Sequence, residues 1–218
     1  MERKIVFSVG EYYHVYNRGV EKRRIFLDRN DKERFLRLLY IANSDIPVVF
    51  RLSQKKPLAD IPVGKKAVAI GAYTLMPNHI HLLIKEVVDG GLSLFMEKLM
   101  TAYAKYFNKK YDRVGSLFQS RFKAEHIDRD EYLKYIYAYI HLNPIKLIEP
   151  TWKEKGIGDM KRAKKFLDTY RYSSYQDYAG LHRPEKIILA PKGFPAYFED
   201  RYAFADAHQD WLDFKPTT

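Results

Sequence analysis

Cysteine is absent from the 218-residue sequence. Its absence excludes a disulfide framework and excludes thiolates both as metal ligands and as catalytic nucleophiles. A metal site in this chain must therefore use histidine, carboxylate, amide or water ligands. The sequence also lacks a G-x-x-x-x-G-K-[ST] element, so no phosphate-binding loop of that type is available to hold a nucleotide.

Long apolar runs are missing as well. No stretch approaches the ~20 apolar residues that a membrane-spanning helix needs. The first residues also lack the apolar segment and small-residue cleavage site of a secretory signal. We therefore expect a protein that stays in the cytoplasm and has no membrane span.

Acidic residues are relatively few: the sequence has 27 Asp and Glu against 38 Lys and Arg, which gives a formal net charge of +11. This excess favours polyanionic partners such as nucleic acid or an anionic membrane surface, and charge alone does not choose between them. Apolar residues make up 46% of the chain and charged residues 30%, which is typical of a soluble globular protein with a real core.

The chain is long enough for one good-sized domain, or for a domain with an appendage. Periodic patterns are clear up to residue 149 and weaker beyond it, where a basic helical stretch, a Tyr-Ser cluster and an aromatic tail follow. We therefore expect a catalytic domain over residues 1–150. Residues 151–218 are expected to form a helical and aromatic appendage packed on that core.

Hydrophobic periodicity predicts alternating strands and helices. The clearest signal is a β-hairpin, because two apolar runs rich in strand-forming residues flank the turn at Pro77-Asn78. The expected strands are 11–18, 47–52, 67–76, 79–85 and 120–127, and the expected helices are 31–43, 92–108 and 130–142. This order favours the α+β class: a ferredoxin-like sandwich with a mostly antiparallel sheet and helices on one face.

Two histidines stand one residue apart on the second strand of the hairpin. Side chains at alternate positions leave the same face of a strand, so the His79 and His81 side chains start ~7 Å apart and can converge on one divalent ion. A His-x-His pair is a weak signal by itself, since two partly exposed strand histidines give the same pattern. On the first strand, His14 could be a further site residue or a core histidine, and the structural role is favoured.

A second pair lies at the end of the last expected helix. Tyr139 and Asn143 are four residues apart, so both side chains lie on one helical face with their Cβ atoms about 5–6 Å apart. The chain has 18 tyrosines, and a tyrosine is most often a core or rim aromatic with a satisfied hydroxyl. Spacing alone therefore leaves the role of Tyr139 open.

Four segments occur together in this order: YHVYNRG (13–19), YTLMPNHIH (73–81), GSLFQSRF (115–122) and YIHLNP (139–144). With them, the chain closely resembles the REP-associated tyrosine transposase family, which is related to small insertion-sequence transposases of the His-hydrophobic-His class. The resemblance covers about residues 12–150, and the segment after residue 149 also resembles the tail of that family.

The resemblance implies a function and a set of site residues. His79, His81 and Asn143 are expected to bind Mg²⁺ or Mn²⁺, and Tyr139 to be the nucleophile. The wider class more often has Gln at the Asn143 position. Two tyrosines of the same helix are rivals of Tyr139: Tyr135 shares its face and Tyr137 points away. The implied activity is cleavage and rejoining of DNA through a 5′-phosphotyrosine.

The implied chemistry suits these residue types. A free tyrosine has a pKa of ~10 and is a poor nucleophile at neutral pH. A cation on the nonbridging oxygens of the phosphate neutralises charge and aligns the reacting groups. Because the phosphodiester is exchanged and not hydrolysed, reversal rejoins DNA without ATP. Attack by a side chain is easier on a flexible single strand than on a regular duplex, so single-stranded DNA is the expected partner. The resemblance implies that this DNA carries hairpins of the REP type.

Grooves for single strands combine cations with aromatic platforms. Two clusters could supply them: Arg18, Lys22, Arg23 and Arg24, and then Arg113, Gln119, Arg121, Phe122 and Lys123. Charge runs are usually just solvated faces, so DNA contact is assigned only because the implied site acts on DNA. The REP-associated group implies a monomer. Two other functions remain as alternatives: a domesticated binding protein that no longer cuts, and a metal-dependent phosphoesterase that activates water.

Overall fold

A four-stranded antiparallel sheet forms the centre of the computed structural model, which describes residues 5–198, 200 and 202–204. Its strands are β1 (Tyr12–Arg18), β2 (Val68–Met76), β3 (His79–Glu86) and β4 (Lys123–Ile127), and they lie in the order β2-β3-β1-β4. The predicted hairpin is thus formed by β2 and β3, and β1 lies between β3 and β4.

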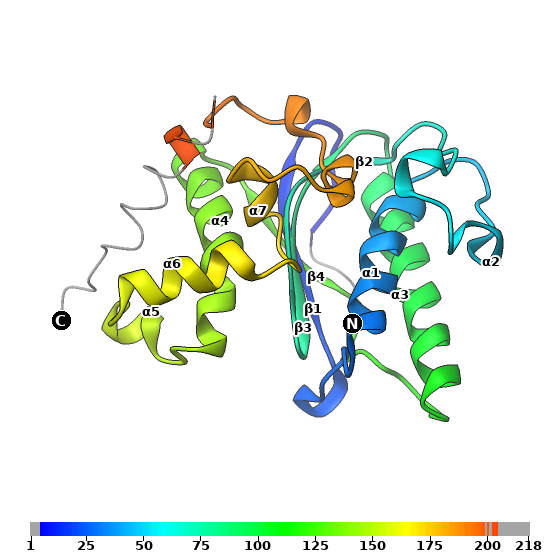
Figure 1. Cartoon of the computed structure of the whole chain (residues 1–218). Helices are drawn as coiled ribbons and strands as arrows, with labels where there is room; N and C mark the ends of the chain where they lie inside the picture. The colour runs from blue at the N-terminus through cyan, green and yellow to red at the C-terminus, as the bar shows by residue number, and fades with distance from the viewer. Residues whose placement is uncertain (1–4, 199, 201, 205–218) are drawn as a thin grey trace.

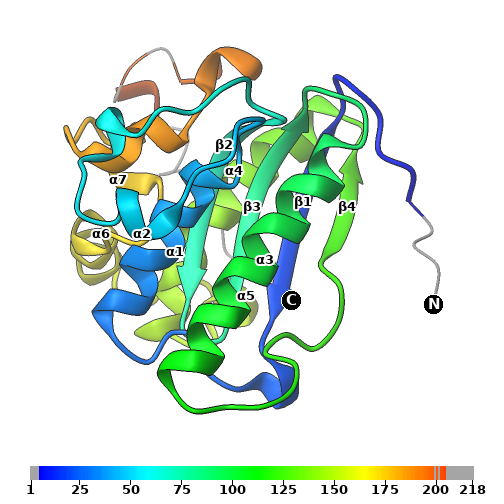
Figure 2. The same ribbon diagram turned by 90° about the vertical axis from the view of Figure 1, so that its right-hand side faces the viewer.

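Helices cover both faces of this sheet (Figures 1 and 2). The two helices that connect strands, α1 (Arg29–Ile41) and α3 (Gly91–Lys110), lie on one face. Helix α4 (Asp130–Leu142), which follows β4, lies on the other. α1 begins at Asp28, whose carboxylate accepts from the Asp31 backbone N–H while the Asp31 carboxylate accepts from the Asp28 backbone, a capping box.

The predicted α+β class and antiparallel sheet are confirmed, and one detail differs. Helices were expected on one face, and this holds only for α1 and α3. The second face is also apolar: Ala69, Ala72 and Leu83 pack there against Ile136 and Ile140 of α4. Every residue of β2 is buried, as in strands that are covered on both faces.

The expected strand over residues 47–52 is wrong. Residues 47–49 are irregular, and Phe50–Ser53 form a short helix, α2. A strand needs a neighbouring edge to satisfy its backbone groups. The outer edge of β2 is bonded to the segment after residue 150 and offers these residues no partner. Val48 and Phe50 pack on the core without pairing, whereas Val49 and Leu52 are 58% and 66% exposed.

The segment after residue 150 returns to the sheet through a series of short helices (Figure 1). These are α5 (Trp152–Lys155), α6 (Met160–Thr169), α7 (Tyr175–Tyr178), η4 (Pro184–Ile188) and η5 (Pro191–Gly193). Earlier in the chain lie three short 3-10 helices, η1 (Val20–Lys22), η2 (Leu58–Asp60) and η3 (Asn143–Leu147). Its backbone bonds to the outer edge of β2 through Leu75 N–H to Tyr172 O, Ser174 N–H to Tyr73 O and Ala190 N–H to Ile70 O. The predicted aromatic tail beyond residue 204 lies outside the described residues.

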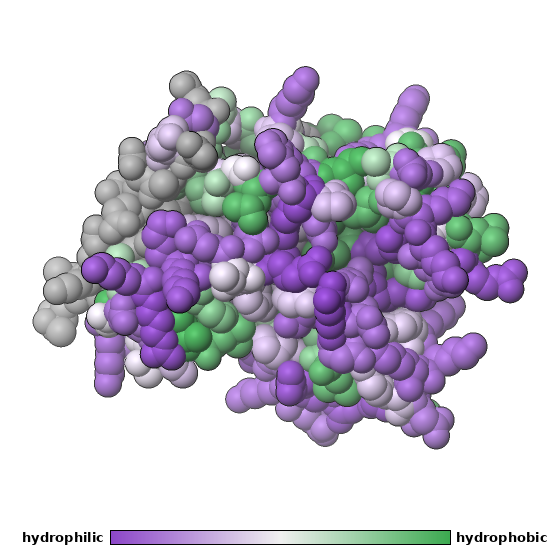
Figure 3. Space-filling model, viewed as in Figure 1, coloured by the Kyte–Doolittle hydropathy of each residue, from purple (hydrophilic) through white to green (hydrophobic). Residues whose placement is uncertain are grey.

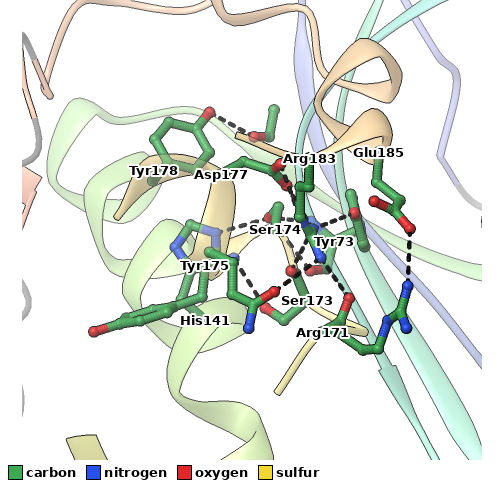
Figure 4. Close-up of polar contacts among 12 residues, drawn as sticks. Tyr73, His141, Arg171, Ser173, Ser174, Tyr175, Asp177, Tyr178, Arg183 and Glu185 are labelled. Carbon is green, nitrogen blue, oxygen red and sulfur yellow. Dashed lines mark hydrogen bonds and ion pairs between the residues drawn. The ribbon is translucent and has the colours of Figure 1, made fainter. Parts of the chain in front are cut away.

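A buried polar cluster joins this segment to the sheet and to α4 (Figure 4). The Arg183 guanidinium lies 2.6 Å from the Asp177 carboxylate and donates to the Tyr73 hydroxyl at 2.7 Å. On the other side of the cluster, the His141 ring of α4 is 2.8 Å from the Ser174 hydroxyl. The C-terminal segment therefore holds α4 and β2 in a fixed relation.

The surface visible in Figure 3 is mainly hydrophilic, with apolar side chains in small separate patches. Among the described residues, no helix combines the length and the apolar character that crossing a bilayer requires.

Candidate active site

The face of the sheet under α4 carries the residues that the sequence singled out. Alternation along β3 sends His79 and His81 to this face and Ile80 and Leu82 to the main core. The His79 and His81 side chains line a cavity of about 470 Å³ between this face and α4. Tyr139 and Asn143, at the end of α4, line the same cavity.

Each of the two histidines has one ring nitrogen held by a neighbour. His79 Nδ1 lies 2.6 Å from the Asn78 Oδ1, and His81 Nδ1 lies 2.9 Å from the His14 Nε2. The two rings are 5.0 Å apart and nearly perpendicular. Metal-binding histidines are commonly oriented in this way through their second nitrogen, which leaves the Nε2 atoms as the candidate ligand atoms.

Burial keeps these imidazoles neutral. Desolvation is the main cause that lowers the pKa of His79 to about 4, and positive charge at Arg18 adds to it. The pKa of His81 falls well below its ordinary value, first because of burial and then because of the neighbouring His14. A neutral imidazole is the form that binds a metal ion.

Asn143 supplies an unpaired oxygen at the same site. Its side chain is buried, and its Oδ1 has no hydrogen-bond partner among the described residues. A buried polar atom without a hydrogen-bond partner destabilises the fold unless a bound ligand or ion contacts it. No group of three His, Cys, Asp or Glu side chains with metal-binding geometry occurs in the described part of the chain. Two imidazole nitrogens and one amide oxygen nevertheless fit a divalent ion that keeps positions for water and phosphate oxygens.

The Tyr139 ring packs between the histidines and a lysine. Its centroid is 5.3 Å from the His81 ring and 5.5 Å from the His14 ring. The Lys153 ammonium, from α5, lies 3.5 Å from the centroid of the Tyr139 ring. Burial raises the pKa of Tyr139, and burial lowers the pKa of Lys153 to about 8. The Tyr139 phenol, whose raised pKa makes deprotonation harder, thus has the Lys153 ammonium packed against its ring.

Comparison with known proteins agrees with this geometry. Residues 56–143 match the family model described as "Transposase IS200 like". The matched segment contains His79, His81, Tyr139 and Asn143. Over this segment the chain is similar to IS200-like transposases. The family resemblance inferred from the motifs is thereby confirmed.

One solved structure supports the fold. A REP-associated tyrosine transposase, solved bound to a REP hairpin, is similar with a TM-score of 0.51 and 15% identity over 85% of this chain and 90% of that chain. A tRNA(His) guanylyltransferase from Saccharomyces cerevisiae has a TM-score of only 0.36, with 12% identity over 91% of this chain and 86% of that chain. No curated protein matches the chain significantly.

Two other tyrosines of α4 are the rivals of Tyr139 that the sequence indicated. Tyr137 is buried on the opposite side of the helix, where it packs against Phe194 and Tyr178. Tyr135 is 36% exposed and lines the cavity, with its ring 5.9 Å from the Tyr139 ring. Tyr137 is therefore out of reach of the cavity. Of these two rivals, only Tyr135 lines the cavity beside Tyr139.

His14 lies in the cavity, although the sequence favoured a structural role for it. Lys153 and Glu125 also belong to the site and were missed. Alternation along β1 puts His14 on the same face as Arg18, but the sequence does not reveal which β3 residues lie opposite them. Lys153 comes from the appendage, and nothing in its local sequence indicates a neighbour on α4.

The predicted DNA-binding residues divide into two groups. Arg18, Gln119 and Lys123 are exposed and line the cavity. The two predicted clusters lie side by side, because Gln119 N–H donates to Arg18 O and Gly19 bridges to Phe118. Exposed residues that lie outside the cavity lining are Lys22, Arg24 and Arg121, and partly exposed ones are Arg23 and Arg113.

Phe122 is a correction. It was predicted to be a stacking platform for bases, but its side chain is 9% exposed and stacks on Phe7. As the residue before β4, it faces the main core together with Tyr13 and Val15. Its aromatic ring therefore stabilises the fold.

Arg18 and Lys123, two of the cations at the cavity wall, allow a quantitative prediction. Each phosphate contact contributes about 0.7 to the slope of log K against log salt for single strands, so we expect Arg18→Gln/Lys123→Gln to reduce the slope by about 1.4. Titration of a fluorescent single strand at several salt concentrations measures it. The matched control is Lys161→Gln/Lys165→Gln on the exposed side of α6. An equal loss of slope in the control would show that the contacts are diffuse.

Proposed function

We propose that this chain is a metal-dependent transposase that cleaves and rejoins single-stranded DNA, with Tyr139 as the nucleophile. One observation carries the proposal: a phenol, two neutral imidazoles and an unpaired amide oxygen line a single cavity. The IS200-like match over the segment that contains all four residues supports the same assignment.

We further propose hairpin-forming single strands as the substrate. The support is the solved relative of similar fold, which holds a REP hairpin. The open, polar cavity and the cations Arg18, Lys123 and Lys146 at its wall suit a phosphate backbone.

The reaction exchanges one phosphodiester for another. The Tyr139 oxygen forms a bond to phosphorus, and the bond from phosphorus to the 3′ oxygen breaks. The 5′ phosphate stays on Tyr139, and the departing 3′ oxygen gains a proton in balance for the one the phenol loses. Attack by the 3′ hydroxyl reverses the step and rejoins the strand.

The residues of the cavity divide this work. A divalent ion held by His79, His81 and Asn143 would supply charge neutralisation at the nonbridging oxygens. Packing against the His81 and His14 rings orients the Tyr139 ring toward the cavity. The Lys153 ammonium packs on the face of the Tyr139 ring and holds it in place. The positive charge of Arg18 lowers the pKa of Tyr139 and so favours its ionised form.

The test uses the full chain and an oligonucleotide hairpin labelled on the 5′ phosphate side of the cleavage point. We expect a protein-DNA adduct that survives denaturant in Mn²⁺ or Mg²⁺ and is lost when a chelator removes the ion. Gel electrophoresis under denaturing conditions measures it.

The same gel separates the alternatives. Cleavage in Mn²⁺ that gives only free DNA products would indicate a phosphoesterase that activates water. Binding without any cleavage, with either ion, would indicate a domesticated binding protein. Either result would contradict the proposed mechanism.

A further inference from the structure

A chain of three polar side chains crosses the sheet beneath the cavity. Glu125 on β4 is the register partner of His14 on β1, and His14 in turn contacts His81 on β3. All three side chains leave the sheet on the α4 face and line the cavity. Three adjacent strands therefore bring a carboxylate and two imidazoles into line.

The hydrogen bond between the His14 and His81 imidazoles needs one ring as donor and the other as acceptor. His14 Nε2 and His81 Nδ1 are 2.9 Å apart, and the rings stack at 5.1 Å with an angle of 18°. Both side chains are buried, at 5% and 6% exposure. A neutral imidazole has one N–H and one acceptor nitrogen, so one ring must donate and the other accept.

Glu125 decides which ring donates. The second nitrogen of His14, Nδ1, is buried, has no hydrogen-bond partner among the described residues and lies 3.8 Å from the Glu125 Oε2. An ionised carboxylate only accepts hydrogen bonds. A proton on His14 Nδ1 is therefore favoured, and the His14 Nε2 is left as the acceptor.

Two phenols orient the Glu125 carboxylate beside His14. Tyr16 donates to Glu125 Oε1 at 2.9 Å, and Tyr132 donates to Glu125 Oε2 at 3.1 Å. Burial and this carboxylate raise the pKa of both phenols to about 12, so they stay protonated donors.

We infer that Glu125 and His14 are positioning residues that fix the proton of His81 on Nδ1 and leave the Nε2 lone pair for a metal ion. The inference rests on the proposed function in that it takes His81 as a ligand. Partners of this kind typically contribute 10–100-fold to metal affinity. Neither residue contacts the reacting atoms.

The first test reads the tautomer directly in the metal-free full chain. The ¹⁵N chemical shifts of the histidine rings are expected to show a protonated Nδ1 and an unprotonated Nε2 for His81. In His14→Phe the acceptor is lost, and we expect the Nε2-protonated form of His81 to appear. His14→Gln offers an amide oxygen in place of the imidazole nitrogen and should restore the Nδ1 proton.

A second variant separates charge from packing. Glu125→Leu leaves the His14–His81 contact in place and removes only the carboxylate. We expect a mixture of His81 tautomers in this variant. An unchanged His81 tautomer in Glu125→Leu would overturn the role of Glu125. The matched control is His126→Gln, an exposed β4 residue that contacts Glu11.

Metal affinity is measured separately by Mn²⁺ titration with electron paramagnetic resonance. We expect the dissociation constant to rise about 10–100-fold in His14→Phe and to return toward the wild-type value in His14→Gln. Wild-type protein that binds Mn²⁺ but carries the His81 proton on Nε2 would overturn the inference and leave the proposed function standing. Wild-type protein with the expected tautomer that binds no Mn²⁺ would count against the proposed function and uphold the proton arrangement.

Discussion

Tyr139→Phe is expected to abolish the covalent adduct, with strand cleavage reduced by at least ~10⁴-fold, because removal of a nucleophile has effects of this size or larger. The substitution deletes one oxygen atom. It keeps the ring between the His81 ring and the Lys153 ammonium, so the packing of α4 should not change. Single-strand affinity is expected to stay within a few-fold of wild type, and the adduct gel together with a binding titration measures both quantities.

Tyr135→Phe is the matched control. It makes the same chemical change one helical turn away, on a tyrosine that lines the same cavity. We expect it to form the adduct at near wild-type rate. If the adduct persists in Tyr139→Phe and disappears in Tyr135→Phe, the nucleophile is Tyr135. Cleavage that persists in Tyr139→Phe without any adduct would favour activated water.

Arg183→Met is expected to lower the free energy of unfolding by about 3–5 kcal/mol, the range found when one partner of a buried ion pair is removed. The Asp177 carboxylate would be left buried, with its side chain only 1% exposed. Burial already raises the pKa of Asp177, and Arg183 is the main opposing influence. The Tyr73 hydroxyl would also lose its donor. Urea unfolding followed by circular dichroism measures the loss.

Two further variants test the cause of that loss. Arg183→Met/Asp177→Leu removes both charges, so it should be more stable than Arg183→Met alone. Lys164→Met breaks an exposed i,i+4 pair with Asp168 and should cost no more than about 0.5 kcal/mol. If Arg183→Met costs as little as Lys164→Met, the cluster contributes little to the docking of the C-terminal segment.

The elements of the fold were largely predictable, because their patterns are local. The hairpin has a clear turn between two apolar runs, and the last helix was predicted over the same residues, 130–142, that the structure gives it. Residues 47–52 failed as a strand because strand formation depends on a free edge elsewhere in the molecule. The sequence also did not reveal that α4 covers the second face of the sheet, because α4 follows the last strand and its position is not fixed by a connection between strands.

The candidate site was predictable in part for the same reason. His79 and His81 follow from the two-residue period of a strand, and Tyr139 and Asn143 from the four-residue spacing of a helix. Their meeting in one cavity depends on how α4 crosses the sheet, which spacing does not reveal. Glu125 and Lys153 reach the site through strand register and through the return of the C-terminal segment, and both are long-range features.

The C-terminal segment has a consequence for how this sheet behaves toward other chains. An uncovered edge strand presents free N–H and C=O groups that recruit another β-strand. Along β2 several of those groups are already bonded to residues 172–190 of the same chain. The C-terminal segment thus prevents another strand from pairing with the outer edge of β2. A truncation that removes this segment would expose a long apolar edge strand and promote aggregation.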